Sequence, residues 1–259
     1  MTATRRIGLI VPSSNTTMET ELPTLLGRYA REHAVDFTFH SSRARLHRVD
    51  AESLARMVDD SDRCAAEVSD ADVDVIAYAC LVAVMARGPG SHAEVEQRLA
   101  EIVRAGRSTK ATVTSSAGAL VRVLTALGLK RVAIVAPYMP ALTELVVSYL
   151  RDSGTDVVDA VSLSVSDNCE VGRLDVQALP EHVSRLDLSQ ADGIVLSACV
   201  QMPSLGAVQA VEDAFGLPVV TAATATTREI MTALGLDAEI DGGGAALRLE
   251  LAPRAAAAT

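Results

Sequence analysis

Tryptophan is absent from this chain of 259 residues, and aromatic residues together make up only 3% of it. Platforms that stack nucleic-acid bases and cages that bind ligand cations both depend on aromatic rings, so this composition argues against them. Basic residues are also few, because 23 Lys and Arg stand against 33 Asp and Glu, a formal net charge of −10. No cluster of Lys and Arg forms a basic face, and we therefore expect no nucleic-acid partner.

Long apolar runs are lacking as well. The first apolar stretch, IGLIV, is cut by Pro12, and no later stretch continues for 18 residues without a polar residue. A signal peptide needs a longer apolar core, and a membrane-spanning helix needs about 20 apolar residues. We therefore expect a cytoplasmic protein without membrane association.

Cysteine and histidine are too few and too scattered to predict a disulfide framework or a metal site. The chain has 4 Cys and 5 His, with no C-x-x-C or H-x-x-x-H spacing. The glycine-rich segments GPG (88–90) and DGGGA (241–245) lack the G-x-G-x-x-G spacing of a dinucleotide site, and there is no P-loop. We expect neither a metal nor a cofactor.

Short β-branched runs alternate with longer amphipathic stretches along the chain. Near-continuous apolar runs bounded by Pro, Gly or Asp are typical of strands buried on both faces. The predicted strands are 7–11, 35–40, 73–80, 111–115, 132–136, 157–165, 193–199 and 219–222, and the predicted helices include 53–69, 91–105, 117–127, 142–152 and 226–234. This alternation predicts an α/β fold with helices on both faces of parallel sheets.

The chain also contains an internal repeat. Segments 5–23, 73–85 and 113–129 resemble segments 130–147, 191–203 and 220–236, in the same order. α/β units can look alike for physical reasons alone, but three matching segments and a shared TALGL ending favour a duplication. We predict two pseudo-symmetric Rossmann-like half-domains, residues 1–115 with 223–259 and residues 116–222, with the active site in the cleft between them.

Ligands of parallel α/β sheets bind beyond the carboxyl ends of the strands. The segments at such ends that carry polar or reactive groups are 12–15 (PSSN), 80–82 (CLV), 137–138 (PY) and 199–201 (CVQ). A cleft between two facing half-domains would bring all four segments together.

Cys80 and Cys199 are the candidate reactive residues. Each ends a predicted buried strand and begins a predicted helix, and the free N–H groups of a helix start lower the pKa of a thiol. A single such cysteine is more often a small buried residue. Two at equivalent positions of a duplicated chain predict thiols on opposite walls of one cleft, suited to nucleophilic or acid–base chemistry.

Other polar residues have two interpretations each. Asn15, Tyr138 and Asn168 are candidate ligand contacts, although Asn also suits turns and helix caps and Tyr after Pro is common at a surface. Cys64 lies in a helical stretch and is expected in the core, and Cys169, in a polar loop, has no assigned role.

Segment 39–48 (FHSSRARLHR) follows the second predicted strand and carries Arg43, Arg45 and Arg48. We expect a loop here, either a mobile lid over an anionic substrate or a solvated basic loop.

Several of these motifs together resemble one known family, the maleate cis–trans isomerases of the aspartate/glutamate racemase superfamily. The similar segments are IGLIVPSSNTTMETELP, FHSSR, YACLVAVMARGPG, TSSAGALV, VAPYMPALTELVVSYL, DNCEVG and LSACVQMPSL, which span nearly the whole chain. The resemblance implies a cofactor-free enzyme, a homodimer, that converts maleate to fumarate through a succinyl-cysteine intermediate.

The resemblance also implies roles for individual residues. Cys80 would be the nucleophile, held as a resting thiolate, and Cys199 the proton donor. Asn15, Tyr138 and Asn168 would contact the substrate. The main chain at four further positions would hold the carboxylates: Leu81, Val82, Val200 and Gln201.

Other functions remain open at this point. An amino-acid or hydantoin racemase would use the same two thiols as an acid–base pair across one stereocentre, and a dicarboxylate-binding protein would use neither thiol chemically. The decarboxylases of the superfamily carry only one of the two cysteines. The thiol positions do not separate a racemase from an isomerase, and only the longer motifs favour the isomerase.

Overall fold

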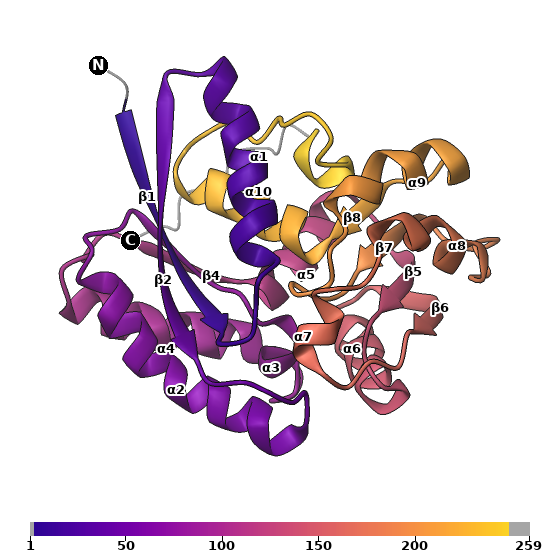
Figure 1. The fold of residues 1–259 in the computed structure, drawn as a ribbon, viewed down its shortest axis with the longest axis horizontal. Helices are drawn as coiled ribbons and strands as arrows, with labels where there is room; N and C mark the ends of the chain where they lie inside the picture. The colour runs from indigo at the N-terminus through magenta and orange to yellow at the C-terminus, as the bar shows by residue number, and fades with distance from the viewer. Residues whose placement is uncertain (1–2, 249–259) are drawn as a thin grey trace.

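The computed structural model describes residues 3–248 and contains two parallel four-stranded sheets with helices on their faces (Figure 1). The first sheet has the order β2-β1-β3-β4 and the second the order β6-β5-β7-β8, so the two halves repeat one topology. The strands are β1 (Ala3–Pro12), β2 (Val35–Ala44), β3 (Val75–Tyr78), β4 (Thr112–Ser115), β5 (Arg131–Ala136), β6 (Asp156–Ser162), β7 (Gly193–Ser197) and β8 (Val219–Thr221). The predicted α/β fold is confirmed.

Helices connect the strands and cover the sheets. The α-helices are α1 (Met18–Glu32), α2 (Ala51–Ser69), α3 (Leu81–Met85), α4 (Ser91–Ala105), α5 (Ser116–Ala126), α6 (Pro140–Asp152), α7 (Asn168–Val171), α8 (Leu179–Ser184), α9 (Val208–Phe215) and α10 (Ala222–Ala233). Short 3₁₀ turns are η1 (Val176–Ala178), η2 (Leu205–Ala207) and η3 (Ala245–Leu247). Within residues 3–248 no helix is both long enough and apolar enough to cross a membrane.

Local sequence explains why these elements form. Every residue of β3 and β7 is buried, as the unbroken apolar runs predict. The helices α5 and α10 begin with hydroxyl caps, in which Ser115 Oγ accepts the Gly118 N–H and Thr221 Oγ1 accepts the Thr224 N–H. A side chain at Gly8 would place its Cβ 2.4 Å from Val68 Cγ1, so glycine allows α2 to pack directly on β1.

The strand order positions the functional segments. β1 and β3 are the central strands of the first sheet, and β5 and β7 those of the second. In each sheet the two central strands lead to connections on opposite sides, which opens a crevice at their carboxyl ends. The segments that follow these four strands are the ones that the sequence predicted to meet.

Two predictions about local structure are wrong. β2 continues to Ala44, because it pairs with β1 in register from Ala3↔Val35 to Pro12↔Ala44, so residues 41–44, beyond the predicted strand 35–40, form strand where a loop was expected. The segment that follows Cys199 forms no α-helix, since regular structure resumes only at η2 and continues into α9.

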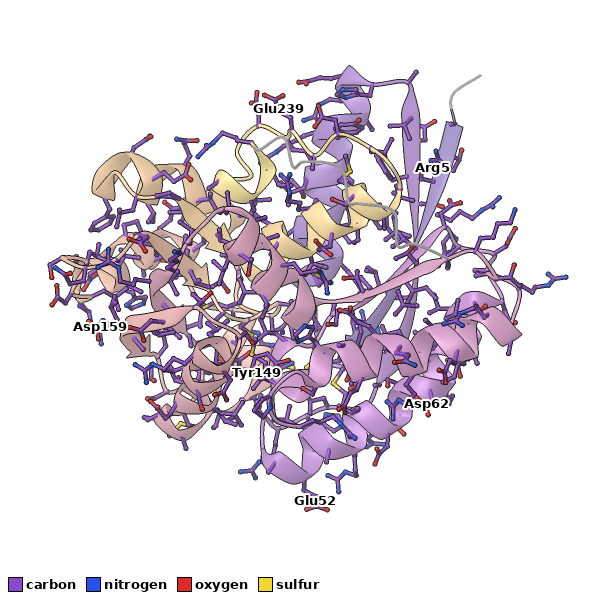
Figure 2. The ribbon with its side chains drawn as sticks, turned by 180° about the vertical axis from the view of Figure 1, so that it is seen from behind. Arg5, Glu52, Asp62, Tyr149, Asp159 and Glu239 are labelled. Atoms are coloured by element: carbon purple, nitrogen blue, oxygen red, sulfur yellow. The ribbon has the colours of Figure 1, made fainter. Side chains whose placement is uncertain are left out.

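The two halves are joined through several helices. α10 follows the last strand of the second sheet but packs against α5, α1 and strands β3 and β4 of the first. Arg122 of α5 forms an ion pair with Glu229 of α10 at 2.6 Å. The Tyr149 hydroxyl of α6, labelled in Figure 2, lies 2.6 Å from Nδ1 of His92 in α4. The half-domain limits 1–115 with 223–259 and 116–222 stay predictions, and residues 249–259 lie outside the described part.

Candidate active site between the two half-domains

A small, largely enclosed pocket lies where the carboxyl ends of the central strands meet. Its lining residues are Pro12, Asn15, Leu46, Val49, Cys80, Leu81, Val82, Tyr138, Asn168, Cys199, Val200 and Gln201. All nine residues proposed from the sequence are among them. Pro12 belongs to the predicted segment 12–15, where it was given no role of its own. Leu46 and Val49 were not proposed, because an apolar residue in a connecting segment carries no chemical signal in the sequence.

Cys80 lies between β3 and α3, where it is the residue preceding the first turn of the helix. Its thiol accepts a hydrogen bond from the Ala83 N–H, which lowers the pKa. Burial outweighs this bond and raises the pKa of Cys80 to about 12. The expectation of a lowered pKa and a resting thiolate is therefore wrong, because burial destabilises the thiolate more than the N–H group at the start of α3 stabilises it.

Cys199 has different surroundings. Its sulfur accepts the Gln201 N–H at 3.4 Å and also the Met202 N–H, although no α-helix follows. The Tyr138 hydroxyl is hydrogen-bonded to the Cys199 thiol and lies 3.2 Å from the Ala198 carbonyl oxygen. These contacts lower the pKa of Cys199, but burial dominates and raises it above the usual value. Both thiols are thus protonated at neutral pH.

The two candidate asparagines use their side chains to connect the halves. Asn15 is fully buried, donates from Nδ2 to the Val200 carbonyl oxygen at 3.2 Å and accepts the Met18 N–H at 3.0 Å. It therefore caps the start of α1 and faces the pocket as well. Asn168 donates from Nδ2 to Ser14 Oγ at 2.8 Å. Asn15 therefore fits both interpretations drawn from the sequence, that of a helix cap and that of a pocket residue.

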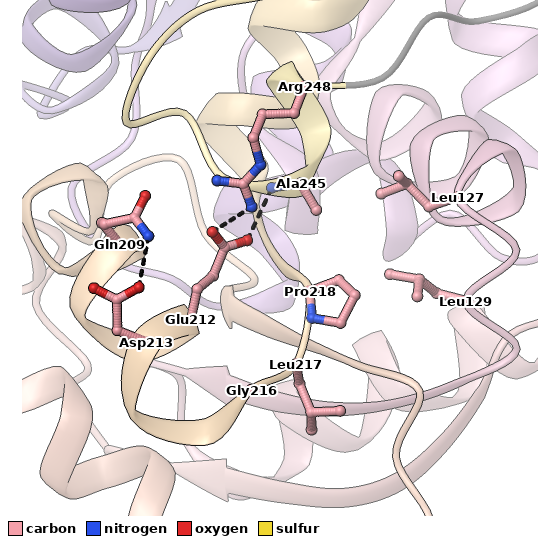
Figure 3. Close-up of a pocket in the computed structure, with 10 residues that line it drawn as sticks. All are labelled: Leu127, Leu129, Gln209, Glu212, Asp213, Gly216, Leu217, Pro218, Ala245 and Arg248. Atoms are coloured by element: carbon pink, nitrogen blue, oxygen red, sulfur yellow. Dashed lines mark hydrogen bonds and ion pairs between the residues drawn. The ribbon is translucent and has the colours of Figure 1, made fainter.

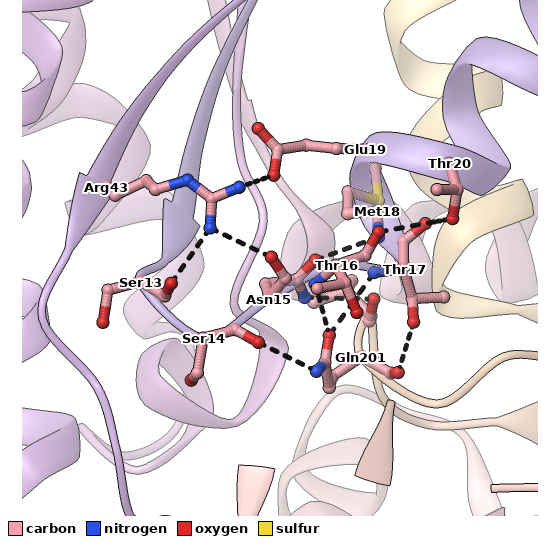
Figure 4. Close-up of polar contacts among 11 residues, drawn as sticks. Ser13, Ser14, Asn15, Thr16, Thr17, Met18, Glu19, Thr20, Arg43 and Gln201 are labelled. Atoms are coloured by element: carbon pink, nitrogen blue, oxygen red, sulfur yellow. Dashed lines mark hydrogen bonds and ion pairs between the residues drawn. The ribbon is translucent and has the colours of Figure 1, made fainter. Parts of the chain in front are cut away.

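The side chain of Gln201 fastens the Cys199 segment to the first half (Figure 4). Its Oε1 accepts the Thr16 N–H at 2.9 Å, while its Nε2 donates to the carbonyl oxygens of Ser14 and Asn168 at 3.0 and 2.8 Å. Thr17 Oγ1 adds a bond to the Gln201 carbonyl oxygen at 2.7 Å. Gln201 thus positions the pocket wall with its side chain, a role that the sequence did not indicate.

Arg43 lies at the end of β2 and does not line the pocket. Its Nη1 donates to the carbonyl oxygens of Ser13 and Asn15, both at 3.0 Å, and its Nη2 pairs with Glu19 (Figure 4). Arg43 therefore supports the segment that carries Asn15. The Arg45 guanidinium contacts His47 at 3.2 Å.

The remaining cysteines lie outside the pocket lining. Cys64 is buried in α2, as expected, and Cys169 is exposed on α7. A wider and more open hollow lies near α9 and η3, around Glu212, Pro218 and Arg248 (Figure 3). It contains neither pocket cysteine. Within residues 3–248 no three His, Cys, Asp or Glu side chains are grouped as a metal site would require.

Comparison with known proteins places the chain in a family. The family model described as arylmalonate decarboxylase matches residues 7–247. A maleate isomerase from Geobacillus stearothermophilus is 52% identical over 243 residues, covering 93% of this chain and 96% of the relative. The chain belongs to the maleate isomerase family. The family that the sequence motifs suggested is confirmed.

Solved structures agree with this assignment. The structure of a maleate isomerase from Pseudomonas putida with maleate has a TM-score of 0.93 and 48% identity, covering 95% of this chain and 98% of that one. A cysteine-to-serine mutant of the Nocardia farcinica maleate cis–trans isomerase, solved with a covalently bound succinylcysteine intermediate, has a TM-score of 0.90 and 48% identity. It covers 95% of this chain and 99% of that one. A double mutant of arylmalonate decarboxylase in its liganded form, at 22% identity and a TM-score of 0.81, shares the fold.

Proposed function

We propose that this chain catalyses the cis–trans isomerisation of maleate to fumarate, without a cofactor, through a succinyl-cysteine intermediate. One observation carries the proposal: two buried thiols, at the ends of equivalent strands, face one small pocket between the half-domains. The choice of reaction and substrate is supported by maleate isomerases that are 52% and 53% identical to this chain over nearly its whole length.

The first step is the addition of a thiolate to the alkene. Sγ of Cys80 forms a bond to one alkene carbon, the π bond breaks, and the thiol of Cys199 gives its proton to the other carbon. Because the pKa of Cys80 is about 12, only the small fraction of enzyme whose Cys80 proton has been released to solvent enters the cycle, and the same thiolate is regenerated at its end. Cys199 remains protonated at the same pH and is ready to act as the acid.

The second step uses the single bond that addition creates. The former double bond now rotates, the Cys199 thiolate takes the proton back, and the S–C bond breaks to release fumarate and the Cys80 thiolate. Atoms and charge balance over the cycle, and neither an oxidant nor a co-substrate enters.

Main-chain N–H groups are suited to hold the substrate carboxylates and the charge that develops on them. Leu81 and Val82 form the first turn of α3, where N–H groups have no partner within the helix. No acceptor within residues 3–248 takes the N–H of Leu81, Val82 or Val200. Asn15, Tyr138 and Asn168 add polar side chains at the pocket wall. Losing one donor that bonds the developing charge directly typically costs about 10²–10³ in rate, whereas the Tyr138 hydroxyl acts through the Cys199 thiol that it bonds.

A spectrophotometric assay of the purified protein with maleate, and no added metal or cofactor, tests the proposal. We expect the absorbance to change from that of maleate to that of fumarate, and NMR to identify fumarate. A racemase would instead exchange the α-hydrogen of an amino acid with solvent, and a binding protein would do neither. No conversion by the folded wild-type protein would refute the proposal.

The homodimer and the cytoplasmic location implied by the family remain predictions. Sedimentation velocity at micromolar concentration checks the first, and fractionation of cells that produce the protein checks the second.

A further inference from the structure

Glu21 lies in α1 of the first half, but its side chain contacts the segment that follows Cys199 in the second half. Its Oε1 accepts the N–H groups of Ser204 and Leu205 at 2.6 and 2.7 Å. Its Oε2 accepts the Ser204 hydroxyl at 3.3 Å. Glu21 is only 8% exposed and is not one of the pocket residues.

A buried carboxylate in this place is costly. Within residues 3–248 no Lys, Arg or His forms an ion pair with Glu21, and burial raises its pKa although the bonds from Leu205 and Ser204 lower it. Buried charges are normally paired, so the bonds from Ser204 and Leu205 are what hold this side chain here. The proposed reaction assigns no proton transfer or substrate contact to Glu21.

The segment that Glu21 holds has no helix of its own. Between Cys199 and η2 the chain forms no regular element, so its conformation depends on tertiary hydrogen bonds. Gln201 fastens the middle of this segment, and Glu21 fastens its far end at Ser204 and Leu205.

The internal repeat provides a natural comparison. The T-E-L sequence at Glu21 recurs in α6, where Glu144 occupies the equivalent position. The Glu144 side chain is 72% exposed and lies 3.9 Å from Arg151. The segment after Cys80 needs no such support, because α3 begins directly after that cysteine and supplies its own hydrogen bonds.

We propose that Glu21 is a positioning residue for Cys199: it holds the 199–205 segment so that the thiol and the neighbouring main chain keep their places in the pocket. This inference rests on the proposed function for its kinetic consequence only. A displacement of 1 Å in a reacting group can cost about 10²-fold in rate, which sets the scale of the effect.

The experiment compares substitutions at Glu21 with two controls. Glu21→Ala removes every acceptor, whereas Glu21→Gln keeps Oε1 for both N–H groups. Glu212→Ala is the control for burial, because Glu212 is also 8% exposed and accepts the N–H groups of Val219 and Ala245. It lines the hollow of Figure 3, which contains neither pocket cysteine. Glu144→Ala is the control for position in the repeat.

Three quantities are measured for each variant: kcat and KM with maleate, the melting temperature, and the alkylation rates of Cys199 and Cys80 by iodoacetamide, read by peptide mass spectrometry. We expect Glu21→Ala to lower kcat about 100-fold and to change the alkylation rate of Cys199 without changing that of Cys80. Glu21→Gln should recover most of kcat. Glu212→Ala should melt at a lower temperature yet keep the wild-type kcat and alkylation ratio, and Glu144→Ala should match the wild type throughout.

The inference is overturned if folded Glu21→Ala keeps the wild-type kcat and alkylation ratio, or if Glu212→Ala changes both as much. If Glu21→Ala does not fold, Glu21→Asp takes its place, since a side chain one methylene shorter does not reach both N–H groups. A wild-type protein inactive on maleate would refute the proposed function, while the alkylation ratio would still decide the role of Glu21.

Discussion

The chain continues differently after its two pocket cysteines, although both end equivalent strands. After Cys80 a helix begins at once, and one N–H group, from Ala83, bonds the thiol. After Cys199 an irregular segment follows, and the thiol is bonded by Tyr138 and by the N–H groups of Gln201 and Met202.

This difference shows how a duplicated site becomes asymmetric. The strand ends bring both thiols to one pocket, but the elements around them give the thiols different hydrogen bonds. A racemase that treats both hands of a substrate alike suits two similar thiols. An enzyme that adds a thiolate to an alkene needs one nucleophile and one acid, and the better-bonded Cys199 with its tyrosine suits the acid.

The largest effect is expected from removing the nucleophile. Cys80→Ala should lower kcat by about 10⁴-fold or more, since no S–C bond can form. Steady-state assays and intact-protein mass spectrometry after exposure to maleate check this. Cys64→Ala, a change of a buried cysteine outside the pocket, should keep kcat and serves as the control. A maleate adduct mapped to Cys199 in the wild type would reverse the assignment.

Cys199→Ser should lower turnover less than Cys80→Ala does, and it should still allow an adduct to form on Cys80. A hydroxyl is a much weaker acid than a thiol, so turnover should fall by about 10²–10⁴-fold, the usual contribution of a general acid. Cys80 should still be alkylated by maleate, and peptide mass spectrometry should find the adduct there. Equal loss of turnover and adduct in both cysteine variants would mean that the thiols act alike, which would contradict the asymmetry.

The pH dependence tests the raised pKa of Cys80. The thiolate is the reactive form, and at neutral pH the thiol predominates because the pKa is about 12. We therefore expect kcat/KM, which reports the free enzyme, to rise about tenfold per pH unit between roughly pH 7 and 9. Burial also raises the pKa of Cys199 above that of an ordinary thiol, so its ionisation should not reverse this rise near neutral pH. A plateau that begins at neutral pH would show that Cys80 is a thiolate at rest.

The smallest effect is expected from Tyr138→Phe. This change removes a hydrogen bond that lowers the pKa of Cys199, so the pKa should rise further and kcat should fall by about tenfold. Alkylation of Cys199 against pH, measured with Cys80→Ala so that one pocket thiol remains, gives the pKa directly. Tyr149→Phe, which loses a bond to His92 outside the pocket, is the matched control. If the pH dependence of Cys199 alkylation is unchanged in Tyr138→Phe, the Tyr138 hydroxyl does not influence the pKa of Cys199.

Much of the fold and of the pocket was predictable because the signals are local. Unbroken apolar runs such as β3 and β7 appear only where both faces of a strand are buried. The position of Cys80 and Cys199 at strand ends then follows from the rule that such ends meet at one edge of a parallel sheet. β2 was predicted too short, because SSRA has little apolar character and becomes strand only through its register with β1.

Other features have no local signal. Leu46 and Val49 are ordinary apolar residues until the chain folds over the pocket. Glu21 and Glu144 share the T-E-L sequence, yet one is buried against the second half and the other is exposed. Their difference depends on which segment of the chain lies opposite, and a sequence motif does not contain that information.

The sequence by itself determined the α/β fold, the duplication and the meeting of the two thiols with Asn15 and Tyr138, because periodicity and strand ends are properties of neighbouring residues. The substrate-contact role of Asn168 was predicted from the resemblance to the family. Only the tertiary structure decided the charge state of the thiols. The pKa of a thiol depends on how completely water is removed and on which donors remain, and at Cys80 burial by both half-domains outweighs the N–H of its own helix.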